Sequence, residues 1–394
     1  MKIGIDATCL GNKRGFGRFT RELLGALVEL DQTNEYLFFI DLHSDETDSI
    51  PQRIRVIVAN TDVAAIEAAS AHGSRSVKDL WAMTRQVLEH KIDVFFFPAV
   101  YSYFPIFNRT KIVVTLHDLI ADHHPDLIFP DTRSKIFWKL KQNAAVKQAH
   151  LIATVSEYSK QQIIEYFNLR PSRLRIISEA AGPDFKVLNA YEDMDNDLVR
   201  YGLEKGEKFL LYVGGISPHK NLSVLIDAFK LIVDKRNSRI KLVLVGDYKD
   251  DPFFSAYPSL KKQVTDLGLE ERVIFTGFVP DHDLAYLYNA ATLLVLPSLE
   301  EGFGLPAVEA MSCGTPVAAS NCGSLPEILG DAGRFFDPRD PQDISTTIRQ
   351  ILSDDGLQAR MREDGLNRSQ QFLWKRAAED TLAIFSELAT HKIP

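Results

Sequence analysis

The sequence predicts an α/β fold of two doubly wound, Rossmann-like domains. Strand-sized apolar runs alternate with amphipathic helical patterns along nearly the whole chain, as in parallel sheets that are covered by helices on both faces. The length of 394 residues suits two domains at about 100–200 residues each. A polar stretch without apolar periodicity, residues 188–197, divides the chain near its middle. We expect ligands to bind in a cleft between the domains, at the carboxyl ends of the strands.

The first half contains predicted strands that are rich in β-branched and aromatic residues. They are Lys2–Asp6, Tyr36–Asp41, Ile54–Ala59, Asp93–Phe97, Lys111–Leu116, Leu151–Thr154 and Arg173–Ile177. Between several of them, apolar residues recur at helical spacing. The predicted helices are Gly17–Leu30, Val77–His90, Thr132–Gln148 and Glu157–Phe167.

The second half repeats this alternation of strands and helices. Its predicted strands are Lys208–Val213, Lys241–Val245, Val273–Phe275, Thr292–Leu296 and Pro316–Ala318. Its predicted helices are Asn221–Val233, Ser259–Gly268, Asp283–Ala290 and Leu305–Ser312, with several more helices toward the C-terminus. The polar stretch 188–197 is the predicted linker between the two halves.

Composition and charge limit the classes of function. The chain is 45% hydrophobic and 25% charged, as ordinary globular proteins are, so disorder, collagen and coiled coil are excluded. The formal net charge of −8 argues against nucleic acid as a partner. Residues 1–190 carry a net charge of +1, and the remaining residues one of −9. An anionic ligand in the second half must therefore be held by local groups.

Neither a membrane span nor a secretion signal is predicted. The longest apolar run, Val94–Val100, contains a proline and is far shorter than the roughly 20 residues that cross a bilayer. The N-terminus reaches glycine and charged residues within about a dozen positions, so it is predicted to form a first strand. Cys9, Cys313 and Cys322 have no metal-ligand spacing, and we expect free thiols in a reducing cytoplasm.

A glycine pair followed by a lysine marks a candidate site in the second half. Gly214 and Gly215 follow an apolar strand, and Lys220 lies at the start of the next helix. Paired glycines let the backbone approach a ligand closely, although a structural turn would explain them equally well. A turn would not explain a cation at a helix N-terminus, where anions are favoured. The pattern therefore favours phosphate binding.

The stretch 296–310 carries the strongest signal in the chain. A strand ends there, a glycine-containing turn follows, and Pro306 lies near the first turn of a new helix, where proline is tolerated. The unpaired N–H groups of such a helix start can face an anion. We expect the backbone around Phe303, Gly304 and Leu305 to do so.

Two glutamates of this stretch are candidate ligand-binding residues. Glu301 precedes the helix and Glu309 follows eight residues later, at most about 12 Å away at a rise of roughly 1.5 Å per residue. This span approximates that from a ribose across a diphosphate to a hexose. The alternative makes Glu301 a favourable charge at the helix start and Glu309 a solvated helix residue. The apolar sequence around Glu309 favours binding, because an unpaired carboxylate there would be costly.

The first half contains two weaker signals. A loop at residues 11–18 joins the first strand to the first helix and contains Gly15 and Gly17, but it lacks the G-x-G-x-x-G spacing of dinucleotide enzymes. His117 and Asp118 follow the end of a strand, where titratable groups face the ligand cleft. A histidine buried in the core is the alternative for His117.

Two aspartate patterns resemble metal sites, and we assign neither to a metal. Asp281 and Asp283 stand directly before a predicted helix, where aspartates cap the helix and complement its dipole. Asp193, Asp195 and Asp197 lie in the linker and lack the glycine and distant glutamate of a calcium loop. We predict neither a metal ion nor a cofactor.

The predicted helix Thr132–Gln148 has the composition of an interfacial helix. Its basic residues are interleaved with apolar ones, which is compatible with a helix on anionic lipid. The basic residues are Arg133, Lys135, Lys139, Lys141 and Lys147, and the apolar ones are Ile136, Phe137, Trp138 and Leu140. The alternative is a helix packed on the sheet with solvated lysines. We favour contact with the membrane surface.

Seven segments, in this order, resemble the retaining glycosyltransferases of family 4. They are GFGRFTREL, TLHDL, ATVSEYSKQQI, YVGGISPHKNL, LVGD, FTGFVPDHDLAYLY and EGFGLPAVEAMSCGTPVAAS. The resemblance covers nearly the whole chain, and the Glu-x7-Glu spacing is its most specific motif. It implies the GT-B fold, with two parallel sheets facing a central cleft. We place the acceptor domain at residues 1–187 together with a C-terminal helix at 374–394 that crosses back to it, and the donor domain at 188–373.

The resemblance also implies the reaction. The sequence is similar to the bacterial group that builds surface polysaccharides, whose members often use GDP-mannose. We expect a retaining, metal-independent enzyme that moves a hexose, with mannose favoured, from a nucleoside diphosphate sugar to a saccharide or lipid-linked acceptor. Its expected location is the cytoplasm, at the inner face of the plasma membrane. A nucleotide-sugar epimerase of the same fold and a non-catalytic sugar-nucleotide-binding subunit are the alternatives.

The matching motifs imply roles for individual residues. Glu301 would lie by the hydroxyls of the donor sugar, Glu309 would bind the ribose, and His117 would lie beside the donor sugar. Lys220 and the backbone of residues 303–305 would hold the diphosphate. The predicted catalytic residues are His117, Glu301 and Lys220; the donor-binding residues are Gly214, Gly215, Ser298, Phe303, Gly304, Leu305 and Glu309; the acceptor side is Gly15, Gly17 and Arg18.

One position departs from the pattern that the resemblance implies. The family commonly has an arginine at the position of Gly215, where it pairs with the lysine to neutralise the diphosphate. Arg18 and His219 are the candidates to compensate for its loss.

Overall fold

The computed structural model of the chain describes residues 1–12, 15–44, 50–64, 76–129, 131–188, 198–236, 239–248 and 255–390. The chain divides into an N-terminal unit, Met1–Glu179 with Leu373–Pro394, and a C-terminal unit, Ala180–Phe372. This division falls slightly before the boundary predicted at residue 187. Nearly all of the predicted linker, with Asp193, Asp195 and Asp197, lies outside the described residues.

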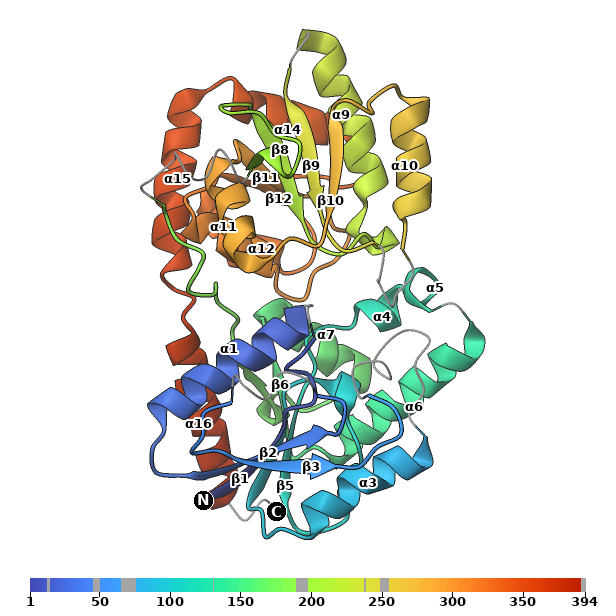
Figure 1. Cartoon of the computed structure of the whole chain (residues 1–394), viewed down its shortest axis with the longest axis vertical. Coiled ribbons are helices and arrows are strands. Elements are labelled where there is room, and N and C mark those ends of the chain that lie inside the picture. The colour runs from blue at the N-terminus through green and yellow to red at the C-terminus, as the bar shows by residue number, and fades with distance from the viewer. Residues whose placement is uncertain are drawn as a thin grey trace. The chain divides into compact units, whose positions relative to one another are not determined.

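The N-terminal unit is built on a parallel sheet with the strand order β3-β2-β1-β4-β5-β6-β7 (Figure 1). The strands are β1 (Lys2–Asp6), β2 (Glu35–Asp41), β3 (Arg55–Ala59), β4 (Val94–Phe97), β5 (Lys111–Thr115), β6 (Leu151–Thr154) and β7 (Leu174–Ile176). β1 pairs with both β2 and β4, through Ile3 opposite Tyr36 and Val94. The sequence located all seven within a residue or two, because the interior strands are buried on both faces and read as continuous apolar runs, and the half-exposed edge strand β3 keeps an apolar run as well.

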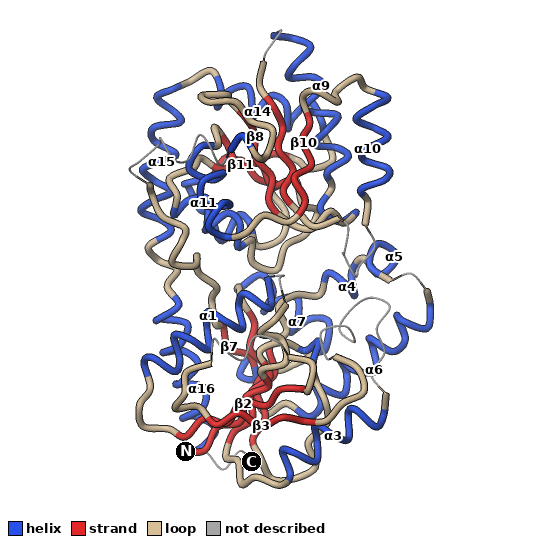
Figure 2. The backbone as a smooth tube through the Cα atoms, viewed as in Figure 1, coloured by secondary structure: helices blue, strands red, loops and turns tan. Residues whose placement is uncertain are grey.

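Helices cover both faces of this sheet (Figure 2). They are α1 (Gly15–Leu30), α3 (Val77–Leu88), α4 (Ile120–His123), α5 (Pro125–Ile128), α6 (Thr132–Gln148), α7 (Glu157–Phe167) and α16 (Trp374–Thr390), with short 3-10 turns at η2 (Val100–Ser102) and η3 (Pro171–Arg173). Side-chain caps set the starts of three of them: Asp79 N–H donates to the hydroxyl of Ser76, Ser159 N–H to that of Ser156, and Ser134 N–H to Asp131. The last helix packs on the first, with the rings of Phe19 and Trp374 6.0 Å apart.

The C-terminal unit has its own parallel sheet, in the order β10-β9-β8-β11-β12-β13. The strands are β8 (Phe209–Val213), β9 (Lys241–Val245), β10 (Val273–Gly277), β11 (Leu293–Leu296), β12 (Val317–Ser320) and β13 (Gly333–Phe336). After β12 the sequence predicted only helices. This prediction was wrong, because the strand β13 follows. In this edge strand Gly333 and Phe336 are buried while Arg334 is exposed, so it lacks the apolar run of the other strands.

The described helices of this unit lie around its sheet (Figures 1 and 2). They are η4 (Pro218–Lys220), α9 (Leu222–Arg236), α10 (Tyr257–Asp266), α11 (Asp281–Ala290), α12 (Leu305–Ser312), α13 (Leu325–Leu329), η5 (Gly330–Ala332), α14 (Pro341–Leu352) and α15 (Asp355–Ser369). The bounds of α12 agree with the prediction. The bounds of α9 correct one detail: Lys220 ends a 3-10 turn before the helix rather than lying at its N-terminus, because Asn221 adopts a left-handed conformation at φ 60°.

Helix α6 differs from the interfacial helix that the sequence suggested. Trp138 is buried, with 7% of its surface exposed, and its indole N–H donates to Asp122, so it is not available to a membrane. Ile136, Phe137 and Leu140 are exposed at 54%, 39% and 65%. Within the described residues, no helix is both long and apolar enough to cross a bilayer.

Each sheet has one point at which the direction of strand connection reverses. In the N-terminal unit this point lies between β1 and β4, and in the C-terminal unit it lies between β8 and β11. Loops leave the carboxyl ends of two such neighbouring strands in opposite directions, which opens a crevice for ligands. The predicted site residues follow these strand ends.

Candidate active site

Lys220, Ser298 and Glu301 meet at the crevice between β8 and β11. Lys220 Nζ lies 2.7 Å from Oε1 of Glu301, and the hydroxyl of Ser298 donates to the same oxygen at 2.7 Å. The side chains of Lys220 and Glu301 are 17% and 14% exposed, so the ion pair is largely shielded but open to a ligand. Asn221 fixes the lysine loop, because its amide donates to the carbonyls of Pro297 and Pro338.

In this arrangement Lys220 and Glu301 can exchange their contact with each other for contacts with a ligand. Glu301 holds the ammonium group of Lys220 in place, so an incoming phosphate meets a cation that is already oriented. A charge-assisted hydrogen bond to phosphate would then replace the contact with the carboxylate. Glu301 would be free to accept hydrogen bonds from hydroxyl groups, which is how carboxylates recognise sugars.

The glycine pair after β8 is shaped by Tyr212. Gly214 has a φ of 152°, and a Cβ there would lie 2.7 Å from the Tyr212 hydroxyl oxygen, so only glycine fits. That hydroxyl donates to the carbonyl of Gly215 at 2.8 Å. Burial raises the pKa of Tyr212 well above its usual value, which keeps the group a donor. At Gly215 the backbone is ordinary, and an added Cβ meets Ser217 Oγ only at 3.4 Å.

Hydrogen bonds to two backbone carbonyl groups stabilise the turn that leads into α12. Gly304 has a φ of 96°, and a Cβ there would lie 2.7 Å from a methyl carbon of Leu325. The hydroxyl of Ser324 donates to the carbonyl of Phe303 at 2.7 Å, and Ala307 N–H donates to that of Gly304. Because the carbonyls point into the protein, the N–H groups at the start of α12 can serve an anion. Pro306 lies in the first turn of α12, as predicted.

Glu309 is enclosed by the protein rather than solvated. It is 1% exposed, and its Oε2 accepts a hydrogen bond from the Tyr288 hydroxyl at 2.8 Å. Burial, with the nearby Glu309 carboxylate, raises the pKa of the Cys313 thiol to about 12. The reading of Glu309 as a solvated helix residue is therefore wrong, and Tyr288 is a partner that the sequence did not reveal. All three cysteines are free thiols, as expected.

His117 follows β5 at the carboxyl edge of the N-terminal sheet. Its Nε2 lies 3.0 Å from the carbonyl oxygen of Pro98, and its Nδ1 lies 3.4 Å from Oε1 of Glu179. Phe19 packs edge-on against the ring, with a centroid distance of 4.7 Å. The Oδ1 of Asp118 accepts a hydrogen bond from the N–H of Ile120, the first residue of α4. Both nitrogens of the histidine are thus engaged within the N-terminal unit.

The glycine loop lies at the end of β1. Gly17 packs against the backbone of Asn12 so closely that a Cβ would overlap its carbonyl oxygen, which explains the glycine. Arg21 secures the same loop by donating to the carbonyls of Leu10 and Asn12. Gly15 begins α1, and Arg18 lies half-buried on its first turn. These three predicted acceptor-side residues therefore share the N-terminal unit with His117, whereas Lys220, Ser298 and Glu301 belong to the C-terminal unit.

The predicted capping role of the aspartates before α11 was wrong. The helix begins at Asp281 and its N-cap is Pro280, so Asp281 and Asp283 lie within the first turn. Asp283 accepts a hydrogen bond from the Tyr201 hydroxyl at 2.6 Å, which lowers its pKa. The favourable interaction with the helix dipole still holds there. Within the described ranges, no three His, Cys, Asp or Glu side chains lie close enough to hold a metal ion.

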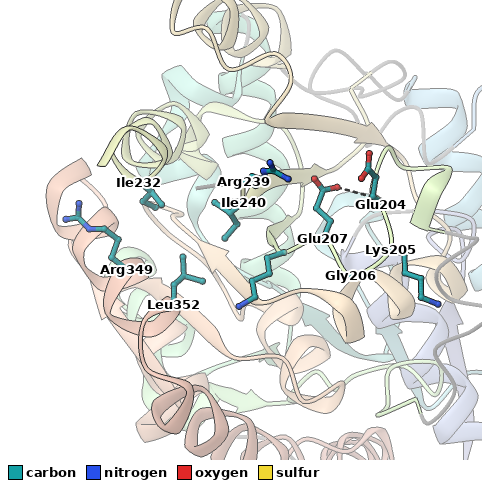
Figure 3. A pocket seen from close by; sticks show the side chains of 10 residues that line it. Glu204, Lys205, Gly206, Glu207, Ile232, Arg239, Ile240, Arg349 and Leu352 are labelled. Carbon is teal, nitrogen blue, oxygen red and sulfur yellow. Dashed lines mark hydrogen bonds between the residues drawn. The ribbon is translucent and has the colours of Figure 1, made fainter. Parts of the chain in front are cut away.

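A cavity of about 480 Å³ lies elsewhere in the C-terminal unit (Figure 3). The loop 204–208 lines it on one side, and Ile232 of α9 and Leu352 of α14 line it on another. These residues lie near the amino ends of β8 and β9. The cavity is therefore separate from the crevice of Lys220 and Glu301, which follows the carboxyl ends of the strands.

Comparison with known proteins identifies the family of the chain. Residues 14–181 match the family described as Glycosyltransferase Family 4, and residues 193–368 match the one described as Glycosyl transferases group 1. O-antigen chain mannosyltransferase B of Escherichia coli is 36% identical over 281 residues, which cover 71% of either chain. The chain belongs to glycosyltransferase family 4. The enzyme is also 33% identical to the serotype-specific mannosyltransferase WbdA of E. coli over 280 residues, or 71% of this chain but 34% of that protein.

Solved structures with low sequence identity share the fold of the whole glycosyltransferase. Sucrose-phosphate synthase from Thermosynechococcus elongatus has a TM-score of 0.75 at 20% identity, over 98% of this chain and 99% of that one. HepE of Anabaena, solved in complex with UDP and glucose, has a TM-score of 0.75 at 22% identity with the same coverage. The predicted GT-B fold is confirmed.

Proposed function

We propose that this glycosyltransferase moves mannose from GDP-mannose to a saccharide or lipid-linked acceptor, with retention and without a metal ion, in the synthesis of a surface polysaccharide. The observation that carries the proposal is the group of Lys220, Ser298 and Glu301 at the crevice between β8 and β11. The choice of mannose is supported by the relatives, which are named as mannosyltransferases.

The diphosphate leaving group is the part of the donor that the C-terminal unit is built to hold. As the glycosidic bond breaks, negative charge grows on the diphosphate, and oriented donors reduce the barrier by meeting that charge. Lys220 would supply the cation, and the N-terminus of α12 would supply backbone N–H groups. Glu301 would position the sugar, and Glu309 the ribose.

The acceptor would bind the N-terminal unit near Gly15, Gly17 and Arg18. We further propose that α6 brings this unit to the inner face of the plasma membrane, through its lysines and the exposed side chains of Phe137 and Leu140. Such contact would bring a lipid-linked acceptor to the site. The enzyme would then work in the cytoplasm at the membrane surface.

A donor panel tests the proposed function. Purified enzyme is incubated with GDP-mannose, GDP-fucose, UDP-glucose and UDP-N-acetylglucosamine, with and without short mannose oligosaccharides as acceptors. We expect slow hydrolysis of GDP-mannose alone and α-linked mannose on the acceptor, detected by mass spectrometry and NMR. An epimerised donor would indicate an epimerase instead, and donor binding without turnover would indicate a binding subunit.

A further inference from the structure

The cavity near the amino ends of β8 and β9 has no part in the proposed reaction. Its volume of about 480 Å³ lies within the range of pockets that hold small organic ligands, about 300–1,000 Å³. The donor crevice follows the carboxyl end of β8, and the five residues of this strand span about 16 Å. A ligand in the cavity would therefore leave the donor crevice open.

The cavity gathers positive charge in an acidic half of the chain. Residues 191–394 carry a net charge of −9, whereas four basic and two acidic side chains line the cavity. One of the acidic residues, Glu207, is already paired with a lysine outside the lining. Its Oε2 lies 2.8 Å from Lys241 Nζ and also accepts a hydrogen bond from the N–H of Glu204. The charge that remains for a ligand is therefore mainly positive.

Two of the basic side chains are available to bind an anion. Within the described residues, Lys208 and Arg239 are exposed, and their side chains make neither a hydrogen bond nor an ion pair. Their backbones are neighbours, because the carbonyl of Lys208 accepts a hydrogen bond from the N–H of Lys241, two residues after Arg239. The two cations thus border the same cavity from adjacent strand starts.

Aliphatic side chains form another part of the lining. Ile232 of α9 and Ile240 are 1% and 5% exposed, and Leu352 of α14 lies beside the cavity with them (Figure 3). Arg349 and Lys205 lie at opposite sides of this group. Cations next to an aliphatic wall suit a molecule that has both an anionic group and an organic body. Inorganic phosphate alone would leave the aliphatic wall without a partner.

We propose that this cavity binds a small phosphorylated organic molecule, at a site separate from that of the donor. A phosphate monoester carries a charge of about −1.5 to −2 at pH 7. Arg239 would bind two of its oxygens with the fork of the guanidinium group, and Lys208 would add a third charge-assisted hydrogen bond. The organic body would pack on the aliphatic wall. This inference does not depend on which sugar the enzyme transfers.

Saturation-transfer NMR with glucose 6-phosphate tests the proposal, with glucose as the uncharged control ligand. Spectra are recorded with and without excess GDP, and we expect the same signals in both. Glucose 6-phosphate should bind the wild type with a Kd of about 1 mM or tighter, and glucose should bind at least tenfold more weakly. Lys208→Gln and Arg239→Gln should each raise the Kd by about tenfold, because each removes a hydrogen bond to a charged group.

The matched control is Lys262→Gln, which removes an exposed lysine of α10 in the same unit and should leave the Kd unchanged. Absence of saturation transfer to glucose 6-phosphate in the wild type overturns the proposal. So does a Kd that Lys208→Gln and Arg239→Gln leave unchanged, or that Lys262→Gln raises as much as they do. Displacement of glucose 6-phosphate by GDP would place the probe in the donor crevice and overturns the proposal as well.

The measurement needs no turnover, so it separates this inference from the proposed function. An enzyme that transfers no mannose but binds glucose 6-phosphate through Lys208 and Arg239 would contradict the proposed function and leave the second site intact. An enzyme that transfers mannose but does not bind the probe would contradict the second site alone.

Discussion

At the scale of single residues, the proposed donor site contains an ion pair and, at Gly215, a glycine where the family resemblance implies an arginine. Lys220 and Glu301 lie 2.7 Å apart at the crevice of the C-terminal sheet. Gly215 stands where the family commonly has a second cation. The C-terminal half is acidic, so the affinity for a diphosphate should respond strongly to any cation added to or removed from this crevice.

Removal of the cation should weaken donor binding. Lys220→Ala should cost about 1.5–3 kcal/mol of binding free energy, the range for hydrogen bonds to charged groups. Calorimetry with GDP measures this cost. Lys262→Ala, which removes an exposed lysine of α10, is the control and should leave the affinity unchanged. An unchanged affinity of Lys220→Ala would mean that the diphosphate binds elsewhere.

Addition of a cation at Gly215 should strengthen donor binding. The backbone there is ordinary and a Cβ has room, so Gly215→Arg should fold without strain. We expect the Kd for GDP to fall by about tenfold, which corresponds to about 1.4 kcal/mol. Gly215→Gln, similar in shape but uncharged, is the control. Equal affinities of the two variants would show that charge balance does not limit binding.

Substitutions of Glu301 and Glu309 should change the kinetics of the enzyme in different ways. Glu309, expected on the ribose, makes contacts that change little during the reaction, so Glu309→Gln should raise KM more than it lowers kcat. Glu301, expected beside the reacting sugar, should mainly lower kcat when replaced by Gln. Steady-state kinetics with a saturating acceptor distinguishes the two. The reverse pattern would mean that the roles are exchanged.

At the scale of elements, α6 presents to solvent a mixture of lysines and apolar side chains that packing does not require. Trp138 and Gln142 face the interior, whereas Ile136, Phe137 and Leu140 do not. Lys141 is partly used by the fold, since its Nζ donates to the carbonyl of Tyr101 at 3.0 Å and lies 5.2 Å from the Trp138 ring. The proposed membrane contact of α6 would therefore depend on fewer basic residues than its sequence contains.

Charge reversal on α6 tests its contact with lipid. Each Lys or Arg near an anionic surface contributes about 1 kcal/mol at low salt. Replacement of Lys135 and Lys139 by Glu should therefore abolish sedimentation with phosphatidylserine vesicles, while GDP affinity in the other unit stays unchanged. Lys160→Glu on α7 is the control on a neighbouring helix. If wild-type enzyme does not sediment with these vesicles at low salt, α6 is a solvated helix without contact to lipid.

At the scale of the whole molecule, the chain forms two units, each built on its own parallel sheet. Each sheet has one crevice, and the candidate residues gather at the loops that leave its strands. Helix α16 belongs to the N-terminal unit although it follows the C-terminal unit in sequence.

Turnover of the whole enzyme is expected to survive removal of metal ions, as the proposed function requires. We expect GDP-mannose hydrolysis and transfer in 5 mM EDTA to remain within about twofold of the untreated rate, because backbone N–H groups and Lys220 are proposed to meet the developing charge. The rate is measured after dialysis, with and without added Mn²⁺ or Mg²⁺. Loss of activity with recovery on addition of either ion would contradict this expectation.

The sequence by itself determined the strands, most helices and the candidate residues that follow strand ends. Buried parallel strands appear as continuous apolar runs, and glycines such as Gly214 and Gly304 mark positions where a side chain would clash. Both signals are local, so they can be read without the fold. The sequence did not predict the edge strand Gly333–Phe336, because this strand is half-exposed and has no continuous apolar run.

The tertiary structure alone decided which partners the candidate residues have. Ser298 and Glu301 are near neighbours in sequence, but Lys220 reaches them only because β8 and β11 are adjacent in the sheet. Glu179 pairs with His117 across 62 positions, and no periodicity connects the two. Contacts of this kind depend on strand order, which arises from packing of the whole sheet and not from the residues of any one segment.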